Sequence, residues 1–149
     1  MAEEVKARYC FGCGDLNPKG LRLSFRLEEG RVVAEFSPHP EHQGWPGVAH
    51  GGLVATLLDE AMGWALAALG IWAVTGKVEF RLRRPVPLGQ PLLVSGRLLR
   101  DRGKALLVRG EITAREGGLL AEAQGLFLRV PKGRERELKA LYGVEESGE

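Results

Sequence analysis

Apolar and polar residues alternate one by one in the first third of the chain. Apolar side chains occupy every second position from residue 21 to residue 27, and polar ones lie between them. This period of two predicts a strand with one buried face. Glu29 and Gly30 then favour a tight turn into a second strand over residues 32–36. The pattern therefore predicts a hairpin.

The spacing changes to three and four residues between positions 52 and 69, which predicts a long helix. Gly70 suits its end. Few residues of this helix are polar, so we expect it to be buried. Its apolar positions are Val54, Leu57, Leu58, Ala61, Met62, Ala65, Leu66 and Leu69.

Four further strands are predicted after the helix, antiparallel and joined by tight turns rich in Gly and Pro. They cover residues 72–82, 92–99, 104–114 and 119–130. The order of two strands, one helix and four strands predicts an α+β fold. In this fold a curled antiparallel sheet of about six strands wraps around one long central helix. An open sheet edge favours a homodimer with a continuous sheet.

The length of 149 residues predicts one domain over 1–149. Turn formers indicate an ordered loop over residues 1–20, and a charged helix and tail are expected over 134–149. The 21 basic and 19 acidic residues are mixed along the chain, which disfavours a nucleic-acid partner.

The charged N-terminus and the acidic residues inside the longest apolar stretch disfavour a signal peptide or a membrane span. Cys10 and Cys13 are the two cysteines, too close in sequence to form a secreted disulfide framework. We therefore expect a cytoplasmic protein. Asn17 is the only asparagine, which fits either a thermophile or a GC-rich genome.

A motif runs from Gly47 through His50, Gly51 and Gly52 to Asp59. With Thr75 and the strand after it, this motif resembles the phenylacetyl-CoA-type and 4-hydroxybenzoyl-CoA-type thioesterases of the hotdog superfamily. The segment from Cys10 to Gly14 also resembles a subgroup of that family. The resemblance implies an acyl-CoA thioesterase of the hotdog fold that needs no cofactor and no metal.

The first amides of a helix lack internal partners and point outward with the positive end of the helix dipole. Gly51 has no side chain to block a thioester carbonyl, so its N–H is the predicted donor to the oxyanion. The resemblance implies that His50 orients this turn or the carbonyl. Asp59 lies eight residues after Gly51, which is about 12 Å along the helix axis. Because this is too far for both groups to act on one carbonyl, the site is expected to combine two protomers.

Four small or polar residues, Gly52, Thr56, Asp59 and Gly63, share one narrow stripe of the helix. This stripe predicts a slot for the acyl group. Asp59 is expected to act there as general base or as nucleophile. The alternative is a carboxylate that is merely satisfied within a dimer interface.

The other candidate site residues also fit purely structural roles. Thr75 resembles the threonine that positions the carboxylate or water in related enzymes, although threonine is also common in strands. Gly44 stands where members often carry Asn or Gln, and Gln43 is the expected substitute. The predicted phosphate-binding residues Arg81, Arg83 and Arg84 also fit a solvated strand edge.

Cys10 and Cys13 provide half of a zinc site, which a second protomer would have to complete, so an ordered loop is the preferred interpretation. His39 and His42 lack a partner spacing that suggests a metal. The acyl group, with an aryl or medium chain expected, depends on aromatic and apolar residues whose orientation the sequence leaves open. These are Trp45, Met62, Trp64 and Trp72.

Two other functions remain as alternatives. An enoyl-CoA hydratase needs a histidine and an acid beside the same bond, whereas His50 and Asp59 are far apart on one chain. A non-catalytic acyl-CoA sensor is the other alternative. A dimer and a tetramer are both compatible with the sequence.

Overall fold

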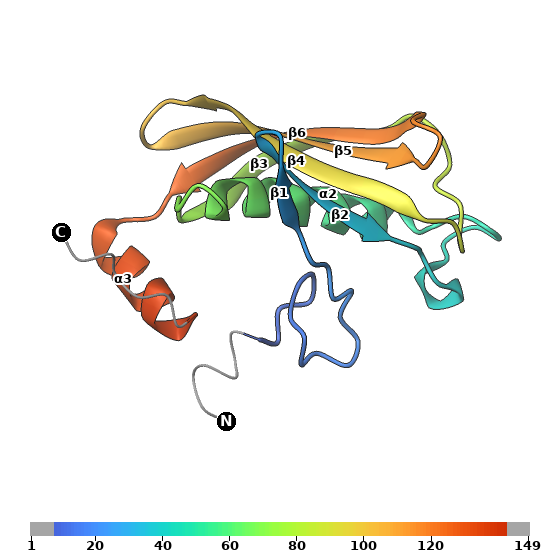
Figure 1. Ribbon diagram of the computed structural model, residues 1–149, viewed down its shortest axis with the longest axis horizontal. Helices are drawn as coiled ribbons and strands as arrows, with labels where there is room; N and C mark the ends of the chain where they lie inside the picture. Colours follow the sequence, from blue (N-terminus) through green and yellow to red (C-terminus); the bar gives the residue numbers. More distant parts are fainter. Residues whose placement is uncertain (1–7, 143–149) are drawn as a thin grey trace. The chain divides into compact units, whose positions relative to one another are not determined.

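The computed structural model describes residues 8–142, which divide into two compact units (Figure 1). One unit is Ser24–Arg129, and the other combines the described segments on either side of it. The predicted first residues of the N-terminal loop and the acidic tail, 1–7 and 143–149, lie outside the described residues. No helix within residues 8–142 combines the length and apolar character needed to span a membrane.

The larger unit contains one six-stranded antiparallel sheet with a long helix along one face (Figure 1). The strands lie in the order β1-β2-β4-β5-β6-β3, which confirms the predicted α+β hotdog arrangement. The elements are β1 (Arg26–Glu28), β2 (Arg31–Phe36), the 3₁₀ turn η1 (Pro40–His42), α2 (Gly51–Ala67), β3 (Ala73–Leu82), β4 (Leu92–Asp101), β5 (Ala105–Ala114) and β6 (Leu119–Arg129).

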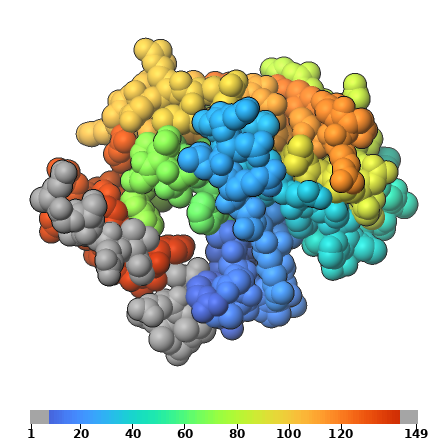
Figure 2. Space-filling model, viewed as in Figure 1, coloured from blue at the N-terminus to red at the C-terminus, as the bar shows by residue number. Residues whose placement is uncertain are grey.

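Helix α2 buries its apolar positions against the sheet, where Val94, Val108 and Ile112 are fully buried. Figure 2 shows atoms of the helix, in green, beneath the gold to orange surface of the sheet. Bonds at the C-terminal end of α2 form a turn around Gly70, whose φ of 73° favours glycine. The predicted helix is therefore confirmed, with regular structure ending at Ala67.

The helix approaches the sheet closely because three glycines on adjacent strands face it. Gly96 and Gly110 are paired across β4 and β5, and Gly125 lies on β6. A Cβ atom at Gly96 would lie 2.2 Å from the carbonyl oxygen of Ala61 in α2. No side chain fits there, so the absence of one at Gly96 sets the spacing between helix and sheet.

The prediction of tight turns between successive late strands is wrong for β3 and β4. Within residues 8–142 these two strands do not pair with each other: β3 pairs with β6 and forms one edge of the sheet, whereas β4 lies between β2 and β5. The proline-rich connection between them joins distant strands rather than forming a hairpin. The alternation of side chains along β3 and β4 is the same whether the two strands form a hairpin or pair with other strands. The sequence pattern therefore could not distinguish a β3–β4 hairpin from the observed arrangement.

The predicted first strand is also mostly wrong, because only residues 26–28 are paired in β1. Arg22 has a φ of 53°, which interrupts extended backbone. The N–H groups of Leu21 and Leu23 donate to the carbonyls of Phe11 and Gly12 at 2.8 and 2.9 Å. The alternating side chains up to Leu23 therefore belong to the ordered loop of the smaller unit.

The predicted C-terminal helix is confirmed as α3 (Lys132–Leu141). An ion pair of 2.9 Å joins Lys139 to Glu135 one turn earlier. No residue of α3 is buried.

Substitution Gly96→Ala is expected to lower the free energy of unfolding by at least about 2 kcal/mol, because the new methyl meets helix backbone. Urea unfolding measures this change. The matched control is Gly63→Ala in α2, where a Cβ has open space and helix propensity adds about 0.5–1 kcal/mol. Equal effects of the two substitutions would contradict the packing argument.

Candidate functional site

The loop before α2 is fixed to the connection between β3 and β4. The N–H of Ala49 donates to the carbonyl of Val86 at 2.8 Å, and Val48 forms a bridge with Pro87. Ala49 and Val86 are both buried. These contacts anchor the chain immediately before the helix begins, so the start of α2 is held in place from outside the helix.

His50 caps the N-terminus of α2. Its Nδ1 accepts the N–H of Gly52 at 2.9 Å, and its own N–H donates to the carbonyl of His42 at 2.8 Å. The acceptor role requires an unprotonated Nδ1, so a neutral His50 carries its proton on Nε2. The predicted positional role of His50 thus has a defined contact.

The cap leaves the first amide of the helix directed outward. Gly51 and Gly52 are exposed, and His50 takes the N–H of Gly52. The N–H of Gly51 has no hydrogen-bond acceptor among residues 8–142. An outward amide at the positive end of a helix is suited to bind a partial negative charge.

Asp59 and Thr75 are brought together from α2 and β3. The Thr75 hydroxyl donates to Oδ1 of Asp59 at 2.8 Å, which orients the half-buried carboxylate. The second oxygen, Oδ2, receives no hydrogen bond from the described part of the chain. A carboxylate held by one oxygen keeps the other available to accept a proton or to attack a carbonyl.

Strand β3 runs beside the stripe of α2 that carries these groups. A Cβ at Gly51 would lie 3.6 Å from a methyl of Leu82, near one end of the strand, while Thr75 near the other end contacts Asp59. Strand β3 forms one edge of the sheet, and its residues are almost all exposed. The amide end and the carboxylate of one helix therefore both lie along an open edge.

The predicted contact residues have local partners. The Thr56 hydroxyl donates to the carbonyl of Gly52 at 3.0 Å within the helix stripe. Oε1 of Gln43 accepts the N–H of Gly47 at 2.9 Å, which closes the loop around Gly44. The amide group of Gln43 thus supports the loop before His50.

The candidate acyl-binding side chains occupy different surroundings. Met62 is fully buried between helix and sheet, whereas Trp45 is 84% exposed on the loop before His50. Trp64 is stacked on Phe25 with ring centroids 6.2 Å apart. Trp72 is half-buried. The four residues therefore do not form one common wall.

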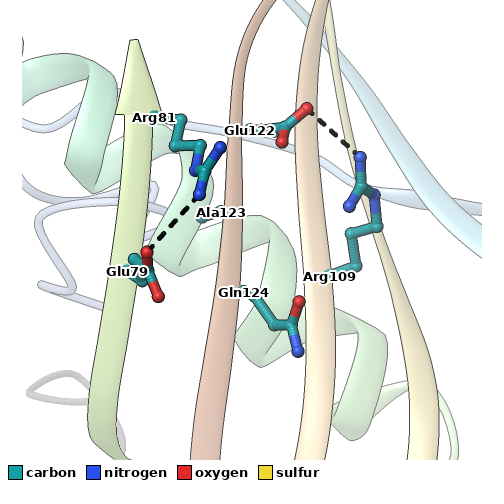
Figure 3. Close-up of a pocket in the computed structure, with 6 residues that line it drawn as sticks. All are labelled: Glu79, Arg81, Arg109, Glu122, Ala123 and Gln124. Carbon is teal, nitrogen blue, oxygen red and sulfur yellow. Dashed lines mark hydrogen bonds and ion pairs between the residues drawn. The ribbon is translucent and has the colours of Figure 1, made fainter.

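Arg81 and Arg83 lie on the sheet face opposite α2, since the residues that alternate with them, Phe80 and Leu82, point toward the helix side. Arg83 donates to Glu122 at 3.0 Å and lowers the pKa of that carboxyl. Figure 3 shows Arg81 beside Glu79, at 3.9 Å, near the same carboxylate. The structure therefore separates these two arginines from Asp59.

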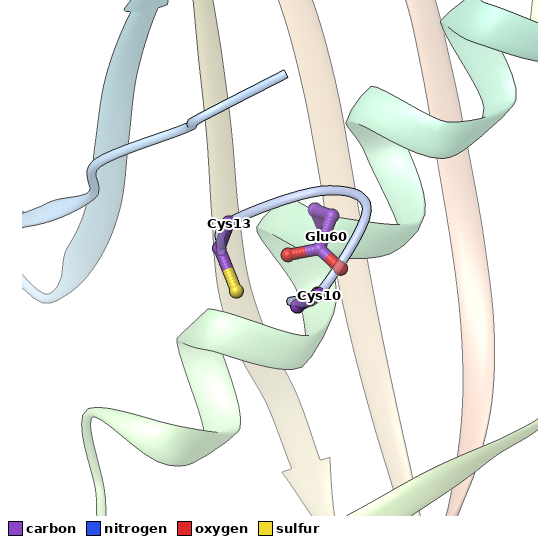
Figure 4. A group of neighbouring side chains, drawn as sticks. All are labelled: Cys10, Cys13 and Glu60. Atoms are coloured by element: carbon purple, nitrogen blue, oxygen red, sulfur yellow. The ribbon is translucent and has the colours of Figure 1, made fainter. Parts of the chain in front are cut away.

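Cys10 and Cys13 occupy one tight turn of the N-terminal loop (Figure 4). Their Sγ atoms lie within 4.8 Å of each other, and no disulfide joins them. The N–H of Gly14 donates to the carbonyl of Cys10 at 2.8 Å, and a Cβ at Gly14 would collide with the backbone. The turn thus requires glycine at position 14. Figure 4 also shows Glu60, which follows Asp59 in α2.

Sequence reasoning missed the role of His42 in supporting His50. Its Nδ1 accepts the N–H of His39 at 2.9 Å, and its ring lies between those of Phe36 and His39. Burial lowers the pKa of His42 below 6.5. Neighbouring prolines and histidines marked the segment as a loop, but no spacing signal indicated this contact.

Because the folded state favours neutral His42, its stabilising contribution is complete above about pH 6.5 and is lost as the pH falls through the lower folded value. We expect wild type to lose more stability than His42→Gln between about pH 7.5 and about pH 5.5 in urea unfolding. The control His39→Gln keeps the backbone donor to His42 and should retain the wild-type dependence. Identical pH profiles for wild type and His42→Gln would contradict this role.

Comparison with known proteins identifies the family. A model described as the Thioesterase superfamily matches residues 46–121, more than half of the chain. Acyl-coenzyme A thioesterase THEM4 of Bos taurus is 33% identical over 104 residues, which cover 69% of this chain and 43% of that protein. Acyl-coenzyme A thioesterase 13 of Homo sapiens is 31% identical, with 64% of this chain and 69% of that protein covered. The chain spans about half the length of the THEM4 relatives it matches.

Solved structures agree with this assignment. A thioesterase superfamily protein of 31% identity aligns with a TM-score of 0.78 over 81% of this chain and 63% of that one. A Streptococcus mutans protein bound to acetyl CoA is 25% identical, with a TM-score of 0.69 over 74% and 90% of the two chains. The Escherichia coli PaaI protein, at 21% identity and a TM-score of 0.71 over 78% and 86%, shares the fold. The predicted resemblance is confirmed: the chain belongs to the thioesterase superfamily.

Proposed function

We propose that this protein hydrolyses acyl-CoA thioesters to a free acid and CoA. The observation that carries the proposal is the Asp59 carboxylate, oriented by Thr75 beside the open edge of β3. The names of the acyl-coenzyme A thioesterase relatives and the bound acetyl CoA of the Streptococcus mutans protein support this substrate class.

Asp59 has two chemically complete routes. As a general base it takes a proton from water, and the resulting hydroxide attacks the thioester carbonyl. As a nucleophile it attacks the carbonyl itself, releases CoA and forms an anhydride that water then hydrolyses. Both routes create negative charge on the carbonyl oxygen, and in both CoA leaves when the C–S bond breaks and its sulfur takes up a proton.

The N–H of Gly51 stabilises this oxyanion in the proposal. Within one helix, Gly51 and Asp59 are about 12 Å apart, too far to act on a single carbonyl. An antiparallel pairing of β3 with β3 of a second copy brings the helix start of one protomer toward the carboxylate of the other. A homodimer is therefore the smallest complete assembly, and a tetramer of two such dimers keeps the same sites.

The remaining roles follow from where each residue lies. His50 holds the helix turn, Thr75 orients Asp59, and Gly52 with Thr56 forms the small stripe beside the acyl group. Gln43 supports the loop at the helix start. Of the three predicted arginines, Arg84 remains the candidate for the CoA phosphates, because Arg81 and Arg83 lie on the sheet face opposite α2.

Substitution Asp59→Asn preserves the shape and the acceptor for Thr75 but removes the charge. We expect the rate of thioester hydrolysis to fall at least about 100-fold, because neither base nor nucleophile remains. Loss of thioester absorbance measures the rate with acetyl-, medium-chain, long-chain and aryl-CoA. A thiol dye is unsuitable because it also reacts with cysteine side chains such as those of Cys10 and Cys13.

The matched control for charge removal is Glu116→Gln, in the exposed turn between β5 and β6. It should keep wild-type turnover. If Asp59→Asn folds and still turns over at the wild-type rate, the catalytic role is wrong. If the wild type binds acyl-CoA but hydrolyses none of the four substrates, the protein is instead an acyl-CoA-binding module.

Substitution Gly51→Pro tests the amide donor directly, because proline lacks the N–H yet is favoured at the first helical position. His50 has φ and ψ of −59° and 136°, which a following proline tolerates. We expect the turnover rate to fall by about 100- to 1,000-fold. The control Gly51→Ala keeps the N–H and places its methyl in ordinary contact with Leu82, so it should stay close to wild type.

Mixing the two inactive variants tests whether the sites are shared. In a heterodimer of Asp59→Asn and Gly51→Pro protomers, one shared site carries both defects and the other carries neither. Statistical mixing after co-refolding should restore about one quarter of wild-type activity. If the mixture stays as inactive as its components while both exchange subunits, each site lies within a single protomer.

A further inference from the structure

A hollow of about 150 Å³ lies on the sheet face opposite α2. We call it the arginine pocket, and its lining residues are Arg31, Ser95, Gly96, Arg97, Arg109 and Glu111. Val94 and Gly96 face the helix, so Ser95 and Arg97, which alternate with them on β4, face away from it. The arginine pocket is therefore separated from Asp59 by the thickness of the sheet.

The arginine pocket has an excess of positive charge. Arg97 and Arg109 lie directly opposite each other on β4 and β5, an arrangement in which like charges destabilise a sheet. Glu111 pairs with Arg109 at 2.8 Å, and Glu122 also contacts Arg109 at 3.3 Å. Across residues 8–142, neither Arg31 nor Arg97 has an ion-pair or hydrogen-bond partner through its side chain. Two guanidinium groups therefore remain uncompensated.

A neighbouring hollow on the same face shows the contrast (Figure 3). There Arg81 lies 3.9 Å from Glu79, and Arg109 contacts Glu122. Arginine and glutamate are balanced in that hollow, so it has no charge left to attract an ion. The imbalance is specific to the arginine pocket.

Ser95 is a second, independent observation. The residue is 92% buried, being 8% exposed, and is the buried polar residue of the described core. It lines the arginine pocket, and its hydroxyl makes no hydrogen bond within the part of the chain that the structure describes. Every fully enclosed side-chain polar atom among the described residues has a hydrogen-bond partner. The Ser95 hydroxyl has none, so it is not fully enclosed and opens into the arginine pocket. A buried donor opening between free guanidinium groups is suited to an anionic ligand.

We propose that the arginine pocket binds a phosphoryl group, either as free phosphate or as part of a phosphorylated small molecule. Guanidinium groups match the geometry of phosphate oxygens, and the Ser95 hydroxyl supplies a further donor. The volume equals that of about five water molecules in the liquid, enough for one phosphate group. Glu111 orients Arg109 from the side.

Isothermal titration calorimetry and thermal unfolding test the proposal on the full chain, with inorganic phosphate as probe and sodium chloride at matched ionic strength as reference. We expect phosphate to bind and to raise the melting temperature beyond the chloride reference. Substitution Arg97→Gln should weaken phosphate binding about tenfold or more. Ser95→Ala should weaken it by a smaller factor.

Arg97→Gln also has a diagnostic effect in phosphate-free buffer. It removes the repulsion with Arg109, so its melting temperature should equal or exceed that of wild type, and phosphate should raise it less. The matched control is Arg102→Gln, which removes the same charge from the exposed turn between β4 and β5. Phosphate binding that falls equally in both variants reflects general charge, and this outcome overturns the proposal.

A second probe distinguishes the sources of the phosphoryl group. If adenosine 3′,5′-bisphosphate binds much more tightly than inorganic phosphate, and Arg97→Gln abolishes the binding of both, the ligand is a phosphorylated small molecule. If the two probes bind equally, the ligand is free phosphate. No stabilisation by either probe overturns the proposal. A change of molecular mass in Arg97→Gln by light scattering, independent of phosphate, also overturns it, because a second copy then covers the arginine pocket.

Discussion

The close contact between α2 and the sheet is the constraint on which the rest of the structure depends. At Gly96 a single methyl would reach within 2.2 Å of a helix carbonyl, so the helix lies as near to β4 as two backbones permit. Interiors packed this densely have little freedom to shift. The apolar face of α2 is thereby fixed against the strands, and its opposite stripe is fixed toward β3. This packing places Asp59 beside β3, where the hydroxyl of Thr75 then orients its carboxylate.

The helix start is controlled separately. His50 caps it, while the preceding loop is attached to the β3–β4 connection through Ala49 and Val86. The outward amide and the carboxylate are thus two rigidly held groups on one helix, and the rise of the helix keeps them about 12 Å apart. No side-chain rotation can close that separation. A reaction that needs both groups at one carbonyl therefore requires a second copy of the chain, and the exposed edge of β3 is where backbone groups are left to pair.

The sequence predicted the features that depend on local periodicity and on the chemistry of neighbouring residues. Helix α2 has an unbroken three-and-four spacing with a glycine at its end, and the motif from His50 to Asp59 places its groups through helix geometry alone. The alternation before residue 26 misled because a loop can also bury every second side chain. Its true partners are carbonyls of residues 11 and 12, and the φ of Arg22 leaves no mark in a pattern of apolar residues.

Long-range pairing was equally beyond reach. The position of β3 beside β6, the support of His50 by the carbonyl of His42 and the alignment of glycines on three strands all join segments far apart or without a spacing signal. The strand pairing and the alignment of glycines depend on strand register, and the His42 contact depends on the path of a loop; the amino-acid composition specifies neither. Arg81 and Arg83 show the same limit: their clustering suggested a common anion site, but alternation along β3 directs them to the face opposite the helix.

Register also explains why the charges of the outer face cannot be rearranged at will. The helix requires glycine at Gly96 and leaves little room for a side chain at Gly110, where a Cβ would lie 3.2 Å from the carbonyl oxygen of Leu58; these two glycines are paired across β4 and β5. The next residues, Arg97 and Arg109, must then oppose each other, because a shift of one position would bring side chains under α2. The repulsion between them is thus a consequence of the inner packing. Glu111 and Glu122 reduce this repulsion by pairing with Arg109, and an anion between the two guanidinium groups would reduce it further. The charges of the outer face are thereby linked to the contact that holds the helix.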